Sequence, residues 1–309
     1  MEERRKTNAK RTAGGFGAGY FSVAIISILL VSVLFAFAVL TAAGGSSEAK
    51  KIAEKDWYKF LSYLLTPAAI AVSGLIFVKS FGEDITEVCR MKKADGKSCL
   101  LALLLTAGMF FGLSPLNGFF IEFLTKYAGY NYVAPSLPGF SAVNIVLTVI
   151  TVCVIPAFFE ELFFRGVLTY GLSGAGLFAA SLISGLYFSL FHMNPAQTPY
   201  QFAVGVLFGL LAIKSGSVFP GIAAHFLNNF IIVILHYACP SFDGFTGTWL
   251  IITVIFGLLC LAAFLFFTVK KDKNEEEGKY KYDYKTFFLY SAIGVAACVM
   301  MWISGLVGA

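Results

Sequence analysis

Three charged residues stand close together in an otherwise apolar stretch, PAFFEELFFRGVL, at Glu160, Glu161 and Arg165. A charged side chain near the centre of a bilayer costs roughly 2.5–3.5 kcal/mol on insertion scales, so such residues mark a functional site by default. On a helix Glu161 and Arg165 share a face, with the acid N-terminal to the base, and can neutralise each other. Glu160 points about 100° away and has no local cation. The stretch therefore predicts an ion pair beside a buried carboxylate.

Two of the three histidines, His192 and His225, also lie in apolar stretches. Asn229 follows His225 by four positions, so an imidazole and an amide share one helix face. Polar groups in lipid must find partners inside the protein, because lipid offers none. We therefore expect Glu160, His192, His225 and Asn229 to come together within a helical bundle.

These groups suit the hydrolysis of a peptide bond by an activated water. A carboxylate shielded from bulk solvent can act as a general base on a trapped water, and a neighbouring histidine can hold that water. An imidazole N–H and an amide N–H can stabilise an oxyanion. Glu160, His192 and His225 also match a catalytic site for zinc or another divalent metal with one open position. Both mechanisms use the same side chains, so the residues alone leave metal dependence open.

The elements that must position these residues are membrane-spanning helices. Of 309 residues, 58% are hydrophobic and 13% are charged, whereas a soluble domain carries about 25% charged residues. A hydrocarbon core of about 30 Å needs roughly 20 apolar residues of helix. Nine stretches approach this length: 17–43, 57–80, 98–121, 140–171, 175–193, 198–213, 218–237, 246–270 and 286–308. We predict an all-α, polytopic integral membrane bundle of eight or nine transmembrane helices, which excludes disordered and fibrous classes.

Basic residues cluster at the N-terminus, over 79–97 and over 270–285. If the N-terminus is cytoplasmic, nine spans place all three clusters on the cytoplasmic side, as the positive-inside rule requires. We predict a cytoplasmic basic tail over 1–16 and one integral membrane domain over 17–309, whose motif-bearing core covers about 140–237. The basic clusters follow the anionic membrane leaflet and imply no binding of nucleic acid.

The fourth, fifth and seventh predicted spans carry the polar residues and are expected to line the site. Small residues recur at four-residue spacing in the fifth and sixth spans, at Ser181 and Gly185 and at Gly205 and Gly209. Such spacing lets helices approach closely. We therefore expect helices in this region to approach closely around a cavity.

The polar residues form three motifs in order along the chain: EELFFR at 160–165, FSLFH at 188–192 and HFLNN at 225–229. They resemble the EExxxR, FxxxH and HxxxN or HxxxD motifs of the CPBP family of intramembrane proteases, also called the Abi or CAAX protease family. That family includes type II CAAX prenyl endopeptidases and bacterial proteins linked to bacteriocin self-immunity and processing. The resemblance covers about 155–235, a quarter of the chain.

The resemblance implies an α-helical intramembrane endopeptidase acting on membrane-associated protein or peptide substrates. Glu160 would be the general base, His192 would hold or activate the water, and His225 with Asn229 would form the oxyanion site. We expect a multi-pass protein of a bacterial plasma membrane with a cytoplasmic N-terminus. Its partners would be the substrate and the lipid bilayer.

The resemblance also implies roles for the ion pair and for a metal. Glu161 with Arg165 would support the structure or assist orientation. Family names often say metalloprotease, with Glu160, His192 and His225 as the matching ligands, whereas a metal-free glutamate mechanism has also been argued for a family member. Zinc or another divalent metal is therefore one of two open readings.

A second catalytic reading rests on GLSG at 171–174, which spells the GxSG nucleophile motif of rhomboid serine proteases. His225, 52 residues downstream, could serve as the base for Ser173. GLSGAG is also typical of a tight loop between helices. The rhomboid reading leaves the buried Glu160 and His192 unexplained.

A non-enzymatic reading is a transporter, or a membrane immunity or scaffold protein. Ionisable residues within the membrane also line proton and solute paths. Transporters are often built from two related halves, and the sequence contains no obvious internal repeat.

Overall fold

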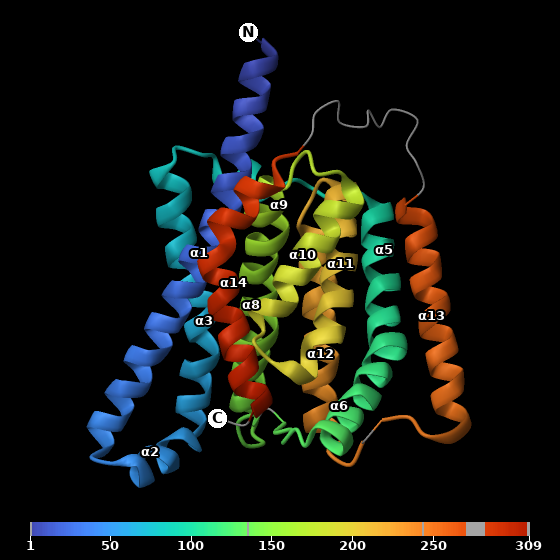
Figure 1. Ribbon diagram of the computed structural model, residues 1–309. Coiled ribbons are helices and arrows are strands. Elements are labelled where there is room, and N and C mark those ends of the chain that lie inside the picture. Colours follow the sequence, from blue (N-terminus) through green and yellow to red (C-terminus); the bar gives the residue numbers. More distant parts are fainter. Residues whose placement is uncertain (1, 135, 243, 270–281, 308–309) are drawn as a thin grey trace.

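The computed structural model of the chain is built from helices that run up and down through one bundle (Figure 1). It describes residues 2–134, 136–242, 244–269 and 282–307, with side chains from residue 14 onward. No strand occurs in these ranges. The predicted all-α class is confirmed.

Eight helices among the described residues are long and apolar enough to span a membrane. In chain order they are α1 (Glu2–Ala43), α3 (Asp56–Ser80), α5–η1–α6 (Gly96–Ala107, Gly108–Leu113, Ser114–Ala128), α7–η2–α8–η3–α9 (Ala142–Thr148, Val149–Val154, Ile155–Glu161, Leu162–Leu168, Thr169–Gly171), η4–α11 (Pro195–Gln197, Thr198–Ser215), α12 (Phe219–Ala238), α13 (Gly247–Val269) and α14 (Tyr284–Val307). Two short helices, α2 (Ser46–Ala53) and α4 (Ile85–Val88), lie in the connections.

The ninth predicted stretch, 175–193, forms the shorter helix α10 (Leu177–Phe191). Its 15 residues extend about 22 Å at 1.5 Å per residue, less than the roughly 30 Å of a hydrocarbon core. The chain therefore turns back soon after His192, at a depth where most other spans continue (Figure 1).

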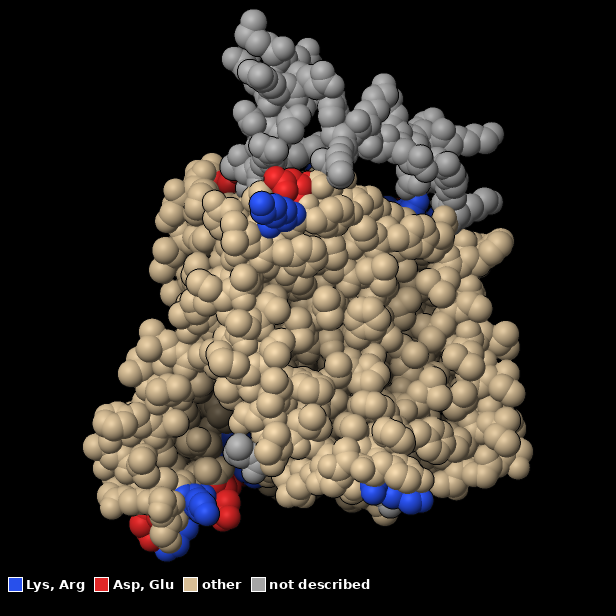
Figure 2. Space-filling model, viewed as in Figure 1, with Lys and Arg blue, Asp and Glu red and all other residues tan. Residues whose placement is uncertain are grey.

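The charged side chains lie at the two ends of the bundle. α1 begins at one end and α14 ends at the other, and the connection 81–95 lies at the end where α1 begins (Figure 1). Figure 2 shows Lys, Arg, Asp and Glu side chains at both ends of one face, with a broad uncharged band between them. The protein is thus a multi-pass integral membrane protein. The basic residues of 1–11 and of 270–281 lie outside the described side chains.

α10 and α11 cross closely at small residues, as their spacing predicted. A Cβ atom on Gly205 would lie 2.7 Å from the Cα of Gly185, and one on Gly209 would lie 3.1 Å from the Cα of Ser181. Backbone therefore meets backbone at this crossing, and a larger side chain would push the helices apart.

The connection 81–95 covers the start of α12. The N–H of Val218 donates to the carbonyl of Arg90 at 3.2 Å, and the Ser217 hydroxyl donates to the carbonyl of Lys92 at 2.5 Å. Because this connection lies over the turn that starts α12, His225 is further from the surface than its place in the second turn of that helix suggests.

Candidate active site

The fourth span holds the first motif in an unusual helical geometry. Two π-helical segments, η2 and η3, flank the short α-helical segment α8, which carries Glu160 and Glu161, while Arg165 lies in η3. In a π-helix each hydrogen bond spans five residues, so residues five apart lie above one another. Such segments are frequent at functional sites. Arg165 acts electrostatically on Glu160, although the regular helix assumed from the sequence places the two side chains on different faces.

Glu161 is the centre of a buried hydrogen-bonded network. Its Oε1 atom accepts from Nη1 of Arg165 at 2.9 Å and lies 3.1 Å from Nδ1 of His225. A carboxylate oxygen accepts, so this Nδ1 carries the proton and donates. Glu161 and Arg165 are fully buried, and His225 is 7% exposed. One carboxylate thus joins the first motif to the third.

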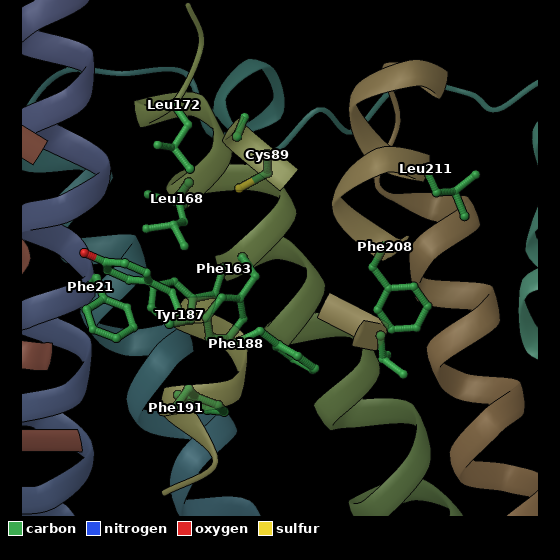
Figure 3. Packing of buried hydrophobic residues seen from close by; sticks show 14 of the residues in the cluster. Phe21, Cys89, Phe163, Leu168, Leu172, Tyr187, Phe188, Phe191, Phe208 and Leu211 are labelled. Atoms are coloured by element: carbon green, nitrogen blue, oxygen red, sulfur yellow. The ribbon is translucent and has the colours of Figure 1, made fainter. Parts of the chain in front are cut away.

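Arg165 is enclosed by aromatic rings and a backbone carbonyl. Its Nη2 atom donates to the carbonyl of Gly205 at 3.1 Å, and its guanidinium carbon lies 4.4 Å from the ring centre of Phe188 and 5.0 Å from that of Phe208. Stacking on aromatic faces stabilises a desolvated cation. Figure 3 shows Phe163 of the fourth span near Phe188 of α10, with Phe208 of α11 across from them.

The far oxygen of Glu161, Oε2, is buried without a hydrogen-bond partner among the described residues. A Cβ on Gly221 would lie 3.0 Å from this atom, so the absence of a side chain lets α12 approach the carboxylate. Gly221 precedes His225 by one helical turn. This close approach is what brings His225 within hydrogen-bonding distance of Glu161.

Glu160 is 8% exposed and has no side-chain hydrogen bond to any described residue. Its carboxylate lies within electrostatic range of His225, Glu161 and Arg165. Both of its oxygens are therefore free for a small molecule such as water, whereas one oxygen of Glu161 is already bound by Arg165 and His225.

His192 ends α10 as its C-cap residue. Its Nδ1 atom lies 2.7 Å from the carbonyl of Phe188, which can only accept, so this nitrogen carries the proton. The Phe188 ring lies between both histidines, with ring centres 4.7 Å from His192 and 6.1 Å from His225. Both imidazoles therefore use Nδ1 to bind protein and leave Nε2 for other partners.

The turn after His192 is supported by two residues from outside the motifs, Trp302 on α14 and Tyr130 in the loop after α6. Nε1 of Trp302 on α14 donates to Oγ1 of Thr198 at 2.8 Å, and that hydroxyl donates to the carbonyl of Asn194 at 3.0 Å. The hydroxyl of Tyr130 lies 3.3 Å from Oδ1 of Asn194. Neither aromatic residue belongs to a motif, and no spacing in the sequence signals either of them.

Asn229 lies on α12 one turn after His225. Its Nδ2 donates to the carbonyl of Val152 in η2 at 3.2 Å, and its Oδ1 accepts from Asn228 at 3.3 Å. His225 itself stacks on Phe208, with ring centres 5.6 Å apart. The amide and the imidazole share one face, as predicted from their spacing.

The structure thus groups the predicted residues with one difference in pairing. Glu160, His192 and His225 lie in one electrostatic neighbourhood with Arg165. The imidazole of His225, however, is bound by Glu161 rather than by Glu160. The predicted ion pair of Glu161 and Arg165 is therefore a network of three side chains that also includes His225. The carbonyl of Gly205 on α11 accepts a further hydrogen bond from Arg165.

The described residues contain no group of three or more His, Cys, Asp or Glu side chains close enough to hold one metal ion. Glu160, His192 and His225 are thus not preassembled as three ligands of one ion in this geometry. Their role as ligands for zinc or another divalent metal stays a prediction.

The rhomboid pairing is not favoured by the geometry. Ser173 is exposed in the turn after α9, where its N–H donates to the carbonyl of Tyr170. The buried His225 gives its Nδ1 proton to Glu161. The GLSG sequence forms a tight connection between helices, the other reading of that motif.

Comparison with known proteins adds one match. Residues 142–231 match a family model described as type II CAAX prenyl endopeptidase Rce1-like. No curated protein and no solved structure matches the chain. The matched segment holds all three motifs and supports, in general terms, a CAAX-type intramembrane protease that acts on membrane-associated substrates. The predicted resemblance to the CPBP, or CAAX protease, family is thus confirmed over the segment that carries the three motifs.

Proposed function

We propose that the protein is an intramembrane endopeptidase in which Glu160 activates a water to hydrolyse peptide bonds of membrane-associated substrates. The observation that carries this proposal is a buried carboxylate that has free lone pairs and stands beside a second carboxylate already bound by a cation and an imidazole. The two acids of the first motif thus have separate tasks. Glu161 holds the site together, and Glu160 is free to take a proton from water.

The charges of Glu160, Glu161 and Arg165 favour this division of roles between the two acids. Two carboxylates and one guanidinium leave one negative charge, and buried charges must be balanced. One proton shared between Glu160 and His225 makes the cluster neutral. With that proton on His225, Glu160 is ionised and can act as a base, while Nε2–H of His225 can donate to an oxyanion.

The proposed reaction proceeds in two steps. Glu160 removes a proton from water as the water oxygen attacks the scissile carbonyl carbon, and the carbonyl electrons move onto its oxygen. Nε2–H of His225 and the second N–H of the Asn229 amide donate to this oxyanion. The C–N bond then breaks and Glu160 returns the proton to the leaving nitrogen. Nε2 of His192 holds the attacking water, and no step requires a metal.

A neighbouring cavity suits an apolar substrate segment. A cavity of about 350 Å³ lies between α1, α3, the connection 81–95 and the fourth span, and Phe158 and Phe159, which directly precede Glu160, form part of its wall. Its lining is almost wholly apolar. We expect the substrate to present either an apolar peptide segment or a lipidated tail, in a bacterial plasma membrane with the protein's N-terminus in the cytoplasm.

The test is peptide cleavage by the purified protein in proteoliposomes. The probes are two peptides of one sequence, one ending in a prenylated Cys-a-a-X tail and the other unprenylated, each with a fluorophore and a quencher. Replacing Glu160→Gln keeps the shape and removes the base, so we expect cleavage to fall at least about 100-fold. Cleavage of one peptide and not the other identifies the substrate type.

Ser173→Ala is the matched control, because this exposed turn residue takes no part in the proposed reaction. We expect it to cut at the wild-type rate. Undiminished cleavage by Glu160→Gln, or loss of cleavage only with Ser173→Ala, contradicts the proposal.

A further inference from the structure

A series of side-chain hydrogen bonds links Asn229 to Tyr200, a residue outside the three motifs. The hydroxyl of Tyr200 on α11 donates to Oδ1 of Asn228 at 2.9 Å. Nδ2 of Asn228 donates to Oδ1 of Asn229 at 3.3 Å, and Nδ2 of Asn229 donates to the carbonyl of Val152 at 3.2 Å. These hydrogen bonds join α11, α12 and the π segment η2 of the fourth span.

The groups at the ends of this series fix which atom donates and which accepts in each of its hydrogen bonds. The two ends of an amide are nearly alike in shape, so its orientation follows from its hydrogen bonds. The Val152 carbonyl can only accept, which turns the nitrogen of Asn229 toward it and the oxygen toward Asn228. Asn228 must then donate, which leaves its own oxygen in need of a donor, and Tyr200 supplies one.

The direction matters because of what Asn229 would present to a substrate. Its amide nitrogen has two protons, and the Val152 carbonyl takes one. The second can donate to an oxyanion, as the proposed reaction requires. The opposite orientation would present a carbonyl oxygen and repel the same charge.

Asn228 is 5% exposed, so its oxygen cannot turn to bulk water for a replacement donor. Without the Tyr200 hydroxyl that oxygen is buried and unpaired, which is costly. Rotation of the Asn228 amide would then place two oxygens face to face and remove the donor that holds Asn229.

We propose that Tyr200 and Asn228 are positioning residues that hold the Asn229 amide with its N–H toward the reacting carbonyl. Neither residue needs to touch the substrate. This inference rests on the proposed function and assigns to it a residue of α11 that no motif contains.

The test combines single and double replacements in the proteoliposome cleavage assay. Asn229→Ala removes the donor and is expected to lower kcat about 100-fold. Tyr200→Phe keeps the ring and is expected to lower kcat about tenfold with KM unchanged. The double variant should be no slower than Asn229→Ala alone, because Tyr200 acts only through that amide. A further drop in the double variant, or a change in KM alone, overturns the inference.

Tyr282→Phe is the matched control for loss of a buried tyrosine hydroxyl. Tyr282, just before α14, donates to the carbonyl of Gly171 at 2.5 Å and does not line the cavity beside Phe158 and Phe159. We expect kcat to stay near the wild-type value in this variant. An equal fall in Tyr282→Phe and Tyr200→Phe would show general loosening of the bundle and contradict a positioning role.

A second readout separates this inference from the proposed function. In protein with ¹⁵N-labelled asparagine, the side-chain signal of Asn229 is assigned by its loss in Asn229→Ala. Tyr200→Phe should shift that signal, whereas Tyr282→Phe should not. An unmoved signal overturns the positioning role even if the enzyme cuts, and failure of the wild type to cut any peptide overturns the proposed function instead.

Discussion

The two histidines of the candidate site are held in contrasting ways. His225 lies in the second turn of a long helix and is fixed by a charged network, because Glu161 binds both its Nδ1 and Arg165. His192 lies at the end of a short helix, where its Nδ1–H donates to the carbonyl of Phe188 in a neutral hydrogen bond. Charge holds the first region, and neutral hydrogen bonds and packing hold the second.

The two histidines also differ in which parts of the chain hold them in place. Every partner in the His225 network lies within residues 142–231, the segment that matches the CAAX protease family model. The turn after His192 is braced by Trp302 and Tyr130, which lie outside that segment. The matched segment therefore contains the proposed reacting groups, and residues outside it support the turn after His192.

The largest effect is expected from breaking the charged network. Arg165→Met leaves Glu161 buried without its cation, which costs about 3–5 kcal/mol of stability. Thermal unfolding in detergent measures this loss. The control is Lys51→Met, which breaks the Lys51–Glu48 pair at 2.6 Å, where both side chains are more than half exposed. Exposed pairs contribute about 1 kcal/mol or less, and equal losses in the two variants would contradict a buried network.

A smaller effect is expected at the α10–α11 crossing, which serves both histidines. Gly205→Ala places a methyl group 2.7 Å from the Cα of Gly185 and displaces the carbonyl that binds Arg165. Overpacking of this kind costs about 1–3 kcal/mol. Gly118→Ala on α6 is the control, since nothing lies within 4 Å of its added methyl. Equal unfolding temperatures for wild type and Gly205→Ala would contradict the close crossing.

Replacements near His192, where the hydrogen bonds are neutral, should lower stability less than those near His225 and should lower activity more. Trp302→Phe removes the N–H that binds Thr198 and costs about 1 kcal/mol of stability. Because this hydrogen bond braces the turn after His192, we expect cleavage to fall several-fold as well. Trp249→Phe is the control, since Trp249 is 68% exposed on α13. Unchanged cleavage in Trp302→Phe would contradict a role for α14 in supporting the site.

The smallest effect concerns the connection that covers α12. Hydrogen bonds from the hydroxyl and N–H of Thr86 and from the N–H of Glu87 hold the pKa of Asp84 below its ordinary value. A lowered pKa stabilises the fold above the ordinary carboxyl pKa, and this contribution is lost as the pH falls through about 4 and below. The unfolding temperatures of wild type and Asp84→Asn should therefore differ at pH 7 and converge near pH 3. A constant difference would contradict this.

Much of the fold and site followed from the residues alone. The scarcity of charge predicted the bundle, and the small residues at 181, 185, 205 and 209 predicted close helix approach, though not which helices cross. The three motifs predicted which helices meet, because charged and polar groups in lipid have few ways to be satisfied. These are strong constraints, and each leaves a pattern in the sequence.

Other features leave no such pattern. The π segments on either side of Glu160 have no signal in the sequence, which was interpreted as one regular helix. The bond from Glu161 to His225 depends on the close approach of α12 at Gly221. Trp302 and Tyr130 brace the turn after His192 through long-range contacts, and an apolar helix containing a tryptophan is too common to signal that role.

The central claim is that Glu161 joins the first motif to the third by binding His225. With only three histidines in the chain, ring ¹⁵N spectra of the histidine-labelled protein in lipid test it directly. The structure predicts protonated Nδ1 at His192 and at His225, and a shift of the His225 signals alone in Glu161→Gln. A proton absent from Nδ1 of His225, or spectra that Glu161→Gln leaves unchanged, would contradict the account.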